Sequence, residues 1–216
     1  LACAGPSVVV VISIDPVPVV SSAATKSICS GVSVNYVPTA AVAGTVFNWT
    51  SSVTVGTVTG NTAVGGLGTI ADVLVNTTNV IGTVRYVITP VANGCSGTPF
   101  NVDVTVDPQP TLSTVVTPLS QVLCSNTAMV IDVNSATVPS AGSVVYDYVA
   151  VASDVSVTGF TASAINQSLA TNISNLNVLN SSLIRQTITY TITPKVLGGL
   201  ACAGPSVVVV ISIDPV

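Results

Sequence analysis

Hydrophobic and polar side chains alternate with a period of two residues along several short segments of this chain. In one segment, Val84, Tyr86 and Ile88 occupy one set of positions, with Thr83 and Arg85 between them. A period of two places one set on the buried face of a β-strand and the other toward water. Gly, Pro, Asn and Asp separate these segments, and each half of the chain has room for roughly seven. The pattern predicts an all-β protein made of Ig-like sandwiches.

The last expected strand of each sandwich ends in Asp-Pro, at Asp107 and Asp214. Aligning the two aspartates gives the inward positions as Val102, Val104 and Val106, matched by Val209, Ile211 and Ile213. On the outward face, Val208 and Val210 replace Asn101 and Asp103. A bare apolar stripe on a strand favours aggregation. We therefore expect Val208 and Val210 to be covered, by residues 149–183 or by a neighbouring domain.

The two ends of the chain have the same sequence. Residues 1–17 read LACAGPSVVVVISIDPV, and residues 200–216 repeat those letters at an offset of 199 residues. The identity predicts a parent protein with a near-identical repeat of 199 residues. A cloning artefact or a single duplicated strand is the alternative explanation.

A weaker repeat lies inside this period. The segment V-R-Y-V-I-T-P around Tyr86 precedes Cys95-Ser-Gly97, and I-T-Y-T-I-T-P around Tyr190 precedes Cys202-Ala-Gly204. The linkers Asp15-Pro-Val-Pro18 and Asp107-Pro-Gln-Pro110 also match, and their prolines end strands and stiffen junctions. We expect three parts: residues 1–17 as the last strand of a preceding repeat, 18–108 as one Ig-like sandwich, and 109–216 as a second, longer one.

The repeat also gives a pairing scheme for the five cysteines. Cys3 is the copy of Cys202, so we expect its partner to lie outside this sequence. The remaining residues then pair as Cys29 with Cys95 and Cys124 with Cys202, each pair joining the first strand of a domain to the loop before its last strand. Such bridges imply an oxidising compartment. Two buried free thiols in each domain are the alternative.

The composition limits the chemistry. Only 6% of the residues are charged, and four basic residues cannot form a nucleic-acid-binding stripe. No apolar run reaches the length of a membrane helix. Without His, neither a Ser-His-Asp nor a Cys-His nucleophile is available. We expect no catalytic site, no cofactor and no metal, and neither nucleic-acid binding nor membrane insertion.

Three weaker alternatives remain. Asp132, Asp147 and Asp154 could supply a glycosidase-like carboxylate pair, since the chain has no Glu. Asp15, Asp107 and Asp214, one at each junction, could bind calcium between domains. The aromatic residues Phe47, Trp49, Tyr146 and Tyr148 could stack on a ligand, although a core position is the simpler interpretation.

The motifs F-x-W, V-x-Y-x-I-T-P, G-C-x-G and V-x-V-x-V-D-P resemble the PKD-like or Ig-like repeats of giant Bacteroidota cell-surface adhesins, especially the SprB-type gliding-motility adhesins. They consist of Phe47, Trp49, Val84, Tyr86, Ile88, Thr89, Pro90, Gly94, Cys95, Gly97, Val102, Val104, Val106, Asp107 and Pro108. The second domain departs from the pattern at the Trp position. The resemblance implies export by the type IX system, display on the outer surface and a role in gliding or attachment.

We therefore expect a non-catalytic structural repeat of a long surface filament. Its partners are neighbouring repeats of the same chain, arranged head to tail, while other regions contact a surface polysaccharide or solid substrate. Each period of two sandwiches should be roughly 70–90 Å long. A carbohydrate- or protein-binding accessory module of a secreted multidomain protein is the alternative function.

Overall fold

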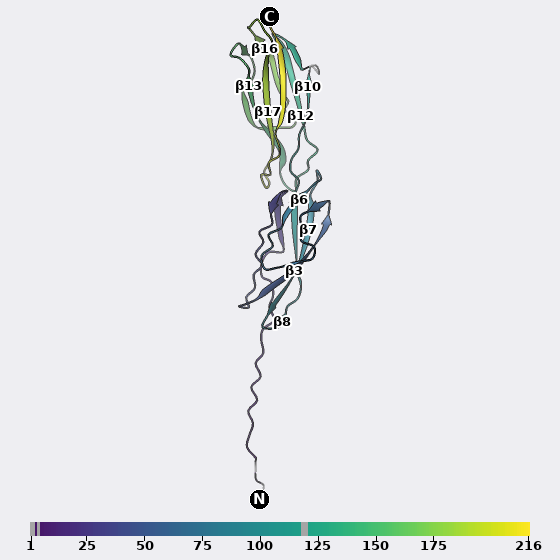
Figure 1. Cartoon of the computed structure of the whole chain (residues 1–216), viewed down its shortest axis with the longest axis vertical. Coiled ribbons are helices and arrows are strands. Elements are labelled where there is room, and N and C mark those ends of the chain that lie inside the picture. Colours follow the sequence, from purple (N-terminus) through teal and green to yellow (C-terminus); the bar gives the residue numbers. More distant parts are fainter. Residues whose placement is uncertain (1–2, 4, 118–120) are drawn as a thin grey trace.

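The computed structural model describes residues 3, 5–117 and 121–216. They form two β-sandwiches stacked end to end, with an extended N-terminal tail (Figure 1). The described residues contain no helix, and so none that could span a membrane. The prediction of an all-β protein with two sandwich domains is confirmed.

The first sandwich pairs a large sheet with a small one. The large sheet has the order β1-β9-β7-β3-β5, with β8 added to β7, and the small sheet has the order β2-β6-β4. The strands are β1 (Thr25–Cys29), β2 (Val32–Ser33), β3 (Val46–Val55), β4 (Val58–Thr59), β5 (Gly66–Leu67), β6 (Val73–Asn76), β7 (Gly82–Ala92), β8 (Cys95–Ser96) and β9 (Phe100–Asp107). The first strand, β1, runs parallel to the last strand, β9.

The second sandwich repeats this plan with one further strand, β10, in its smaller sheet. Its sheets have the orders β11-β18-β17-β13-β15 and β10-β12-β16-β14. The strands are β10 (Ser113–Thr117), β11 (Val122–Cys124), β12 (Thr127–Asn134), β13 (Ser143–Ala152), β14 (Val157–Thr158), β15 (Ser163–Ser168), β16 (Ile173–Asn180), β17 (Gln186–Leu197) and β18 (Val207–Asp214). Here β11 runs parallel to the last strand, β18.

Each sandwich has its own hydrophobic core. One core contains buried residues between Val20 and Val106, and the other contains residues between Val116 and Ile213. The predicted inward residues of both last strands are at most 5% exposed. The apolar positions that alternate in the sequence are therefore the buried positions of these strands, because every second side chain enters a core.

The expected cover over the last strand of the second sandwich is absent. Val208 is 59% exposed and Val210 is 42% exposed, so this prediction was wrong. Within residues 149–183, β15 pairs with β13 as β5 pairs with β3, and β14 pairs with β16 as β4 pairs with β6. β15 lies at the edge of the sheet away from β18 and β14 lies in the other sheet, so the outer face of β18 stays open.

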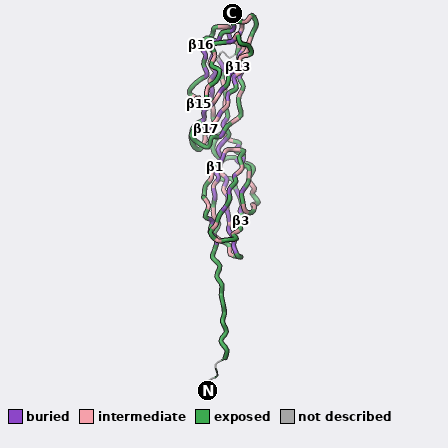
Figure 2. Tube along the Cα trace, turned by 90° about the vertical axis from the view of Figure 1, so that its left-hand side faces the viewer, coloured by how far each residue is buried: buried purple, intermediate pink, exposed green. Residues whose placement is uncertain are grey.

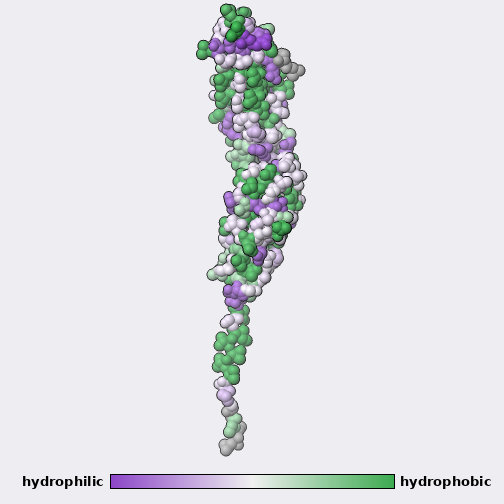
Figure 3. Space-filling view, in the orientation of Figure 1, coloured by the Kyte–Doolittle hydropathy of each residue, from purple (hydrophilic) through white to green (hydrophobic). Residues whose placement is uncertain are grey.

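The described part of residues 1–17 forms no strand and runs outside both sandwiches (Figure 2). Its valines and isoleucines are exposed, and Figure 3 shows them as an apolar stretch along the tail. The assignment of this segment to the last strand of another domain stays a prediction.

Candidate functional site at the junction between the domains

The linker Asp107–Pro110 joins β9 to the second sandwich, and its first residue is fully buried. The Asp107 carboxylate accepts hydrogen bonds from the Ser140 backbone N–H at 2.9 Å and from the Ser140 hydroxyl at 3.0 Å. A second contact runs from the Val138 backbone N–H to the Asn79 carbonyl oxygen at 2.7 Å. A buried carboxylate is costly unless it is hydrogen-bonded, and both of its oxygens are satisfied here. This aspartate therefore ties the two domains together.

Pro110 at the other end of the linker packs against the loop before β18. A Cβ atom on Gly204 would collide with the Pro110 carbonyl oxygen, so only glycine allows the linker to pass. The Gly204 N–H also donates to the Pro194 carbonyl oxygen at 3.0 Å, which fixes the loop to β17. The Gly of the Cys-x-Gly motif is thus the point where the linker touches the loop.

A disulfide crosses the same junction. Cys29, the last residue of β1, is bonded to Cys202, which lies in the loop before β18 and is 3% exposed. Their Cα atoms are 5.5 Å apart, in the usual range for a disulfide. The bond joins the first domain to the second rather than closing either one. In a disulfide-bonded protein this indicates an oxidising compartment.

The predicted pairs Cys29–Cys95 and Cys124–Cys202 were wrong, and the strand directions explain why. Because β1 is parallel to β9, Cys29 lies beside Asp107 at the end of β9, whereas Cys95 precedes the start of β9. Eight residues of strand separate the two ends, roughly 25 Å. A disulfide needs Cα atoms within about 7 Å. The same argument applies to Cys124, which lies beside Asp214 at the end of β18.

The other cysteines of the described chain are free thiols: Cys3 and Cys124 are exposed, and Cys95 is partly buried. That Cys3 bonds outside this sequence stays a prediction. The bond across the junction was missed because the sequence pattern does not show which way the first strand runs relative to the last. Ser140 was also missed, since nothing in its sequence context marks it as the partner of Asp107.

The three aspartates weighed as a carboxylate pair lie in unrelated places. Asp147 on β13 binds the Lys195 ammonium at 2.6 Å and the Asn166 backbone N–H at 2.7 Å. Partial burial raises the pKa of Asp147, but these hydrogen bonds outweigh it and leave the pKa below its usual value. Asp154 accepts a turn hydrogen bond from the Ser156 N–H, and Asp132 belongs to β12 in the other sheet. The arrangement serves local structure.

The aspartates considered for calcium are likewise separate. Asp107 binds Ser140, Asp214 forms an ion pair with Arg185, and Asp15 accepts a hydrogen bond from the Asn93 side chain. Among residues 3, 5–117 and 121–216, no three acidic, Cys or His residues gather closely enough to hold a metal ion. The junction carboxylates instead bind protein donors.

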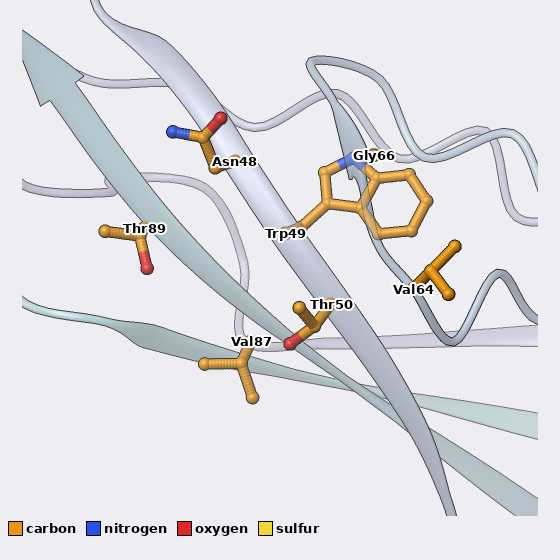
Figure 4. A pocket seen from close by; sticks show the side chains of 7 residues that line it. All are labelled: Asn48, Trp49, Thr50, Val64, Gly66, Val87 and Thr89. Carbon is orange, nitrogen blue, oxygen red and sulfur yellow. The ribbon is translucent and has the colours of Figure 1, made fainter.

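A surface pocket of about 310 Å³ lies beside Trp49 on the first sandwich (Figure 4). The indole lies over Gly66, where a Cβ atom would collide with the ring, and it packs edge-on against Tyr86 with centroids 5.5 Å apart. Trp49 is only 7% exposed, so its ring is a core element rather than a stacking platform. Tyr86 is fully buried and donates its hydroxyl to Asp72 at 2.8 Å; burial and this bond raise its pKa.

The family model described as "PKD-like domain" matches residues 26–110 and again residues 121–216. The chain belongs to the PKD-like domain family. No curated relative matches it. Having two matched units in sequence, the chain is a tandem of PKD-like domains.

Several solved structures of tandem sandwich domains are similar over most of the chain. The chicken CNTN1 FN1–FN3 domains are 14% identical with a TM-score of 0.35; 92% of this chain matches, and it spans 66% of that one. The fibronectin(III)-like modules of Clostridium thermocellum CbhA are 12% identical with a TM-score of 0.29; 92% of this chain matches, and it spans 93% of that one. Titin domains I67–I69 are 9% identical with a TM-score of 0.38; 91% of this chain matches, and it spans 65% of that one. Identities and TM-scores this low support no conclusion about the function of this chain.

Proposed function

We propose that this chain is one period of a long extracellular filament, in which PKD-like domains follow one another head to tail and transmit tension. The observation that carries the proposal is the Cys29–Cys202 bond, because it makes a covalent connection across the junction in addition to the peptide chain. Asp107 and Ser140 add a buried polar contact at the same place. A flexible string of independent modules needs neither feature.

The repeated ends of the sequence support a filament of many periods. Seventeen identical residues at an offset of 199 are expected where near-identical units are copied along a chain. Each domain of such an array contacts only its neighbours, as in other repeat proteins. The role we propose is that of the stalk of a cell-surface adhesin used for gliding or attachment, exported by the type IX system.

The alternative, an accessory module that binds carbohydrate, has less support. Carbohydrate binding usually needs an accessible aromatic ring, and the only tryptophan is buried against Gly66 and Tyr86. We also propose a non-catalytic role, for a separate reason. Of the carboxylates considered for catalysis, Asp147 is bound to Lys195 and Asp154 to a backbone donor.

Electron microscopy of the parent protein, or of several periods joined in sequence, tests the filament. We expect a thin, stiff fibre with an axial repeat of roughly 70–90 Å, set by strand length and by the short Pro-rich links. Compact globules, or strings that bend freely at every second domain, would overturn the proposal.

A further inference from the structure

Two free thiols lie at opposite ends of the stacked pair of domains. Cys124 ends β11 at the free end of the second sandwich, and Cys95 lies in β8 at the end from which the N-terminal tail leaves (Figure 1). Both are at least partly exposed, whereas the bonded Cys202 is 3% exposed. Their positions in the two sandwiches can be compared with those of the bonded pair, Cys29 and Cys202.

Cys124 occupies in the second sandwich the place that Cys29 has in the first. Cys29 is in register with Asp107 on the parallel strand β9, and Cys124 is in register with Asp214 on the parallel strand β18. Each is the last residue of its strand. Both cysteines therefore stand at the end of the sandwich where the chain leaves it.

The residues that follow confirm the equivalence. After each cysteine comes a serine whose hydroxyl accepts a hydrogen bond from the backbone N–H of a buried asparagine: Ser30 from Asn76 at 3.0 Å and Ser125 from Asn180 at 2.8 Å. The side-chain amide of each asparagine then donates to the last strand, at the Val106 and Ile213 carbonyl oxygens, at 2.9 Å in both cases. An equivalent Ser–Asn hydrogen-bond cluster in each domain thus holds the chain directly after the cysteine.

Cys95 in turn matches Cys202. Both come two residues before a glycine whose N–H donates to a proline carbonyl oxygen, Gly97 to Pro90 at 2.8 Å and Gly204 to Pro194 at 3.0 Å. The linker passes that glycine in both domains, since a Cβ on Gly97 would collide with the Pro18 carbonyl oxygen as one on Gly204 would with Pro110. The loop therefore has the same position relative to the incoming linker.

The linker path and the cysteine positions of the bonded junction are thus present at the other junction. The path from Asp107 through Pro110 to Gly204 and Cys202 is matched by the path from Asp15 through Pro18 to Gly97 and Cys95. Asp15 is the sequence copy of Asp214, which lies in register with Cys124. If residues 18 onward follow residue 216, as the identical ends predict, Cys124 of one period faces Cys95 of the next.

We propose that Cys124 of each period forms a disulfide with Cys95 of the following period, so that every junction of the filament carries the bond seen at Cys29–Cys202. This inference rests on the proposed function. Each bond joins two Sγ atoms, and the two protons and two electrons pass to a disulfide oxidant, an oxidised thiol-disulfide oxidoreductase or glutathione disulfide, which becomes two thiols. Cys3, the copy of Cys202, pairs with Cys29 of the preceding period.

The disulfides make the filament nearly inextensible. Cys29 and Cys202 are 173 residues apart, which leaves 26 of each 199-residue period outside the closed loop. Fully extended, 26 residues span at most roughly 90 Å. This is close to the 70–90 Å expected of a folded period, so unfolding a domain adds almost no length. The Cys124–Cys95 bond provides a second covalent path across the junction that the first bond leaves unbridged.

A chain in which residues 18–216 follow residue 216 directly contains one complete junction of the second kind. It should be produced in an oxidising compartment, and its bonds mapped by non-reducing digestion with thermolysin and mass spectrometry. We expect the first-copy Cys124 peptide linked to the second-copy Cys95 peptide, beside Cys29–Cys202 in both copies. Titration of the denatured protein should find three free thiols: Cys3, the first-copy Cys95 and the second-copy Cys124.

Two variants of this chain sharpen the thiol count. Cys124→Ser in the first copy should give four free thiols, because the second-copy Cys95 loses its partner and becomes titratable. Cys3→Ser, the matched control, removes a thiol that has no partner in this chain and should give two. A count that falls by one in both variants would show that the first-copy Cys124 is free, against the proposal.

The outcomes separate the two proposals. Five free thiols in the unsubstituted two-period chain, or a bond from the first-copy Cys124 to any other cysteine, would overturn the disulfide at this junction. The filament would still stand in that case if stiff fibres form. Bonded junctions in a molecule that remains compact would refute the filament alone.

Discussion

Residues 1–17 and 200–216 have the same sequence and different structures. The second copy contains β18, which lies between β17 and β11 and places Ile211 in the core at 0% exposure. In the first copy the corresponding Ile12 is 80% exposed, and its described residues, 3 and 5–17, form no strand. Alternation of apolar side chains therefore specifies which face a strand buries, but neighbouring strands must supply the hydrogen bonds and the core. Substitutions at positions 199 residues apart can test this comparison.

The largest difference is expected at the cysteines. Cys202→Ser removes a bond that closes 173 residues, which the chain-entropy relation values at about 5 kcal/mol. Urea unfolding should show a corresponding loss of stability, and reducing agent should have no further effect. Cys3→Ser, the control, should behave as the parent chain. Equal stability of the two variants would mean that Cys29–Cys202 does not form in solution.

The next difference is expected in the core. Ile211→Ala leaves a cavity at a fully buried site and should lower the free energy of unfolding of the second domain by about 2–5 kcal/mol. Circular dichroism should report this loss, while fluorescence of Trp49, the only tryptophan, follows the first domain. Ile12→Ala should change the free energy of unfolding obtained from either signal by less than about 0.5 kcal/mol. A large effect of Ile12→Ala would show that the tail has a partner in solution.

A smaller difference is expected at the glycines. Gly204→Ala forces the Pro110 carbonyl away from the loop and should cost about 1–3 kcal/mol. At Gly5, the sequence copy, a Cβ atom has no neighbour within 4 Å, so Gly5→Ala should be silent. Urea unfolding of both variants measures the difference. If Gly204→Ala is also silent, the linker does not touch this loop.

The smallest effect is expected on the outer face. Val210→Thr and Val11→Thr both replace exposed side chains with another β-branched residue, and each should change the free energy of unfolding by less than about 0.5 kcal/mol. At this position the two copies should behave alike. A cost above about 1 kcal/mol for Val210→Thr alone would show that another molecule covers the face of β18.

Much of the fold followed from local pattern. The inward residues of both last strands, the core position of Trp49 and the all-β class came from periodicity and composition, since these depend on each strand separately. The disulfide did not follow, because matched spacing identifies equivalent cysteines without saying which end of a sandwich each occupies. The predicted cover over Val208 and Val210 failed for a similar reason, since the length of a segment does not say which part of the sandwich its residues reach.

The sequence by itself determined the strands' inner faces, the two repeated domains and the residues that recur at each junction. Only the tertiary structure decided that first and last strands run parallel, which sends Cys29 to one end of its sandwich and Cys95 to the other. Side-chain alternation is a property of a single strand, whereas strand direction depends on contacts between residues far apart in the chain. The same physics leaves the described part of residues 1–17 exposed and forms the core strand β18 in the second copy of that sequence.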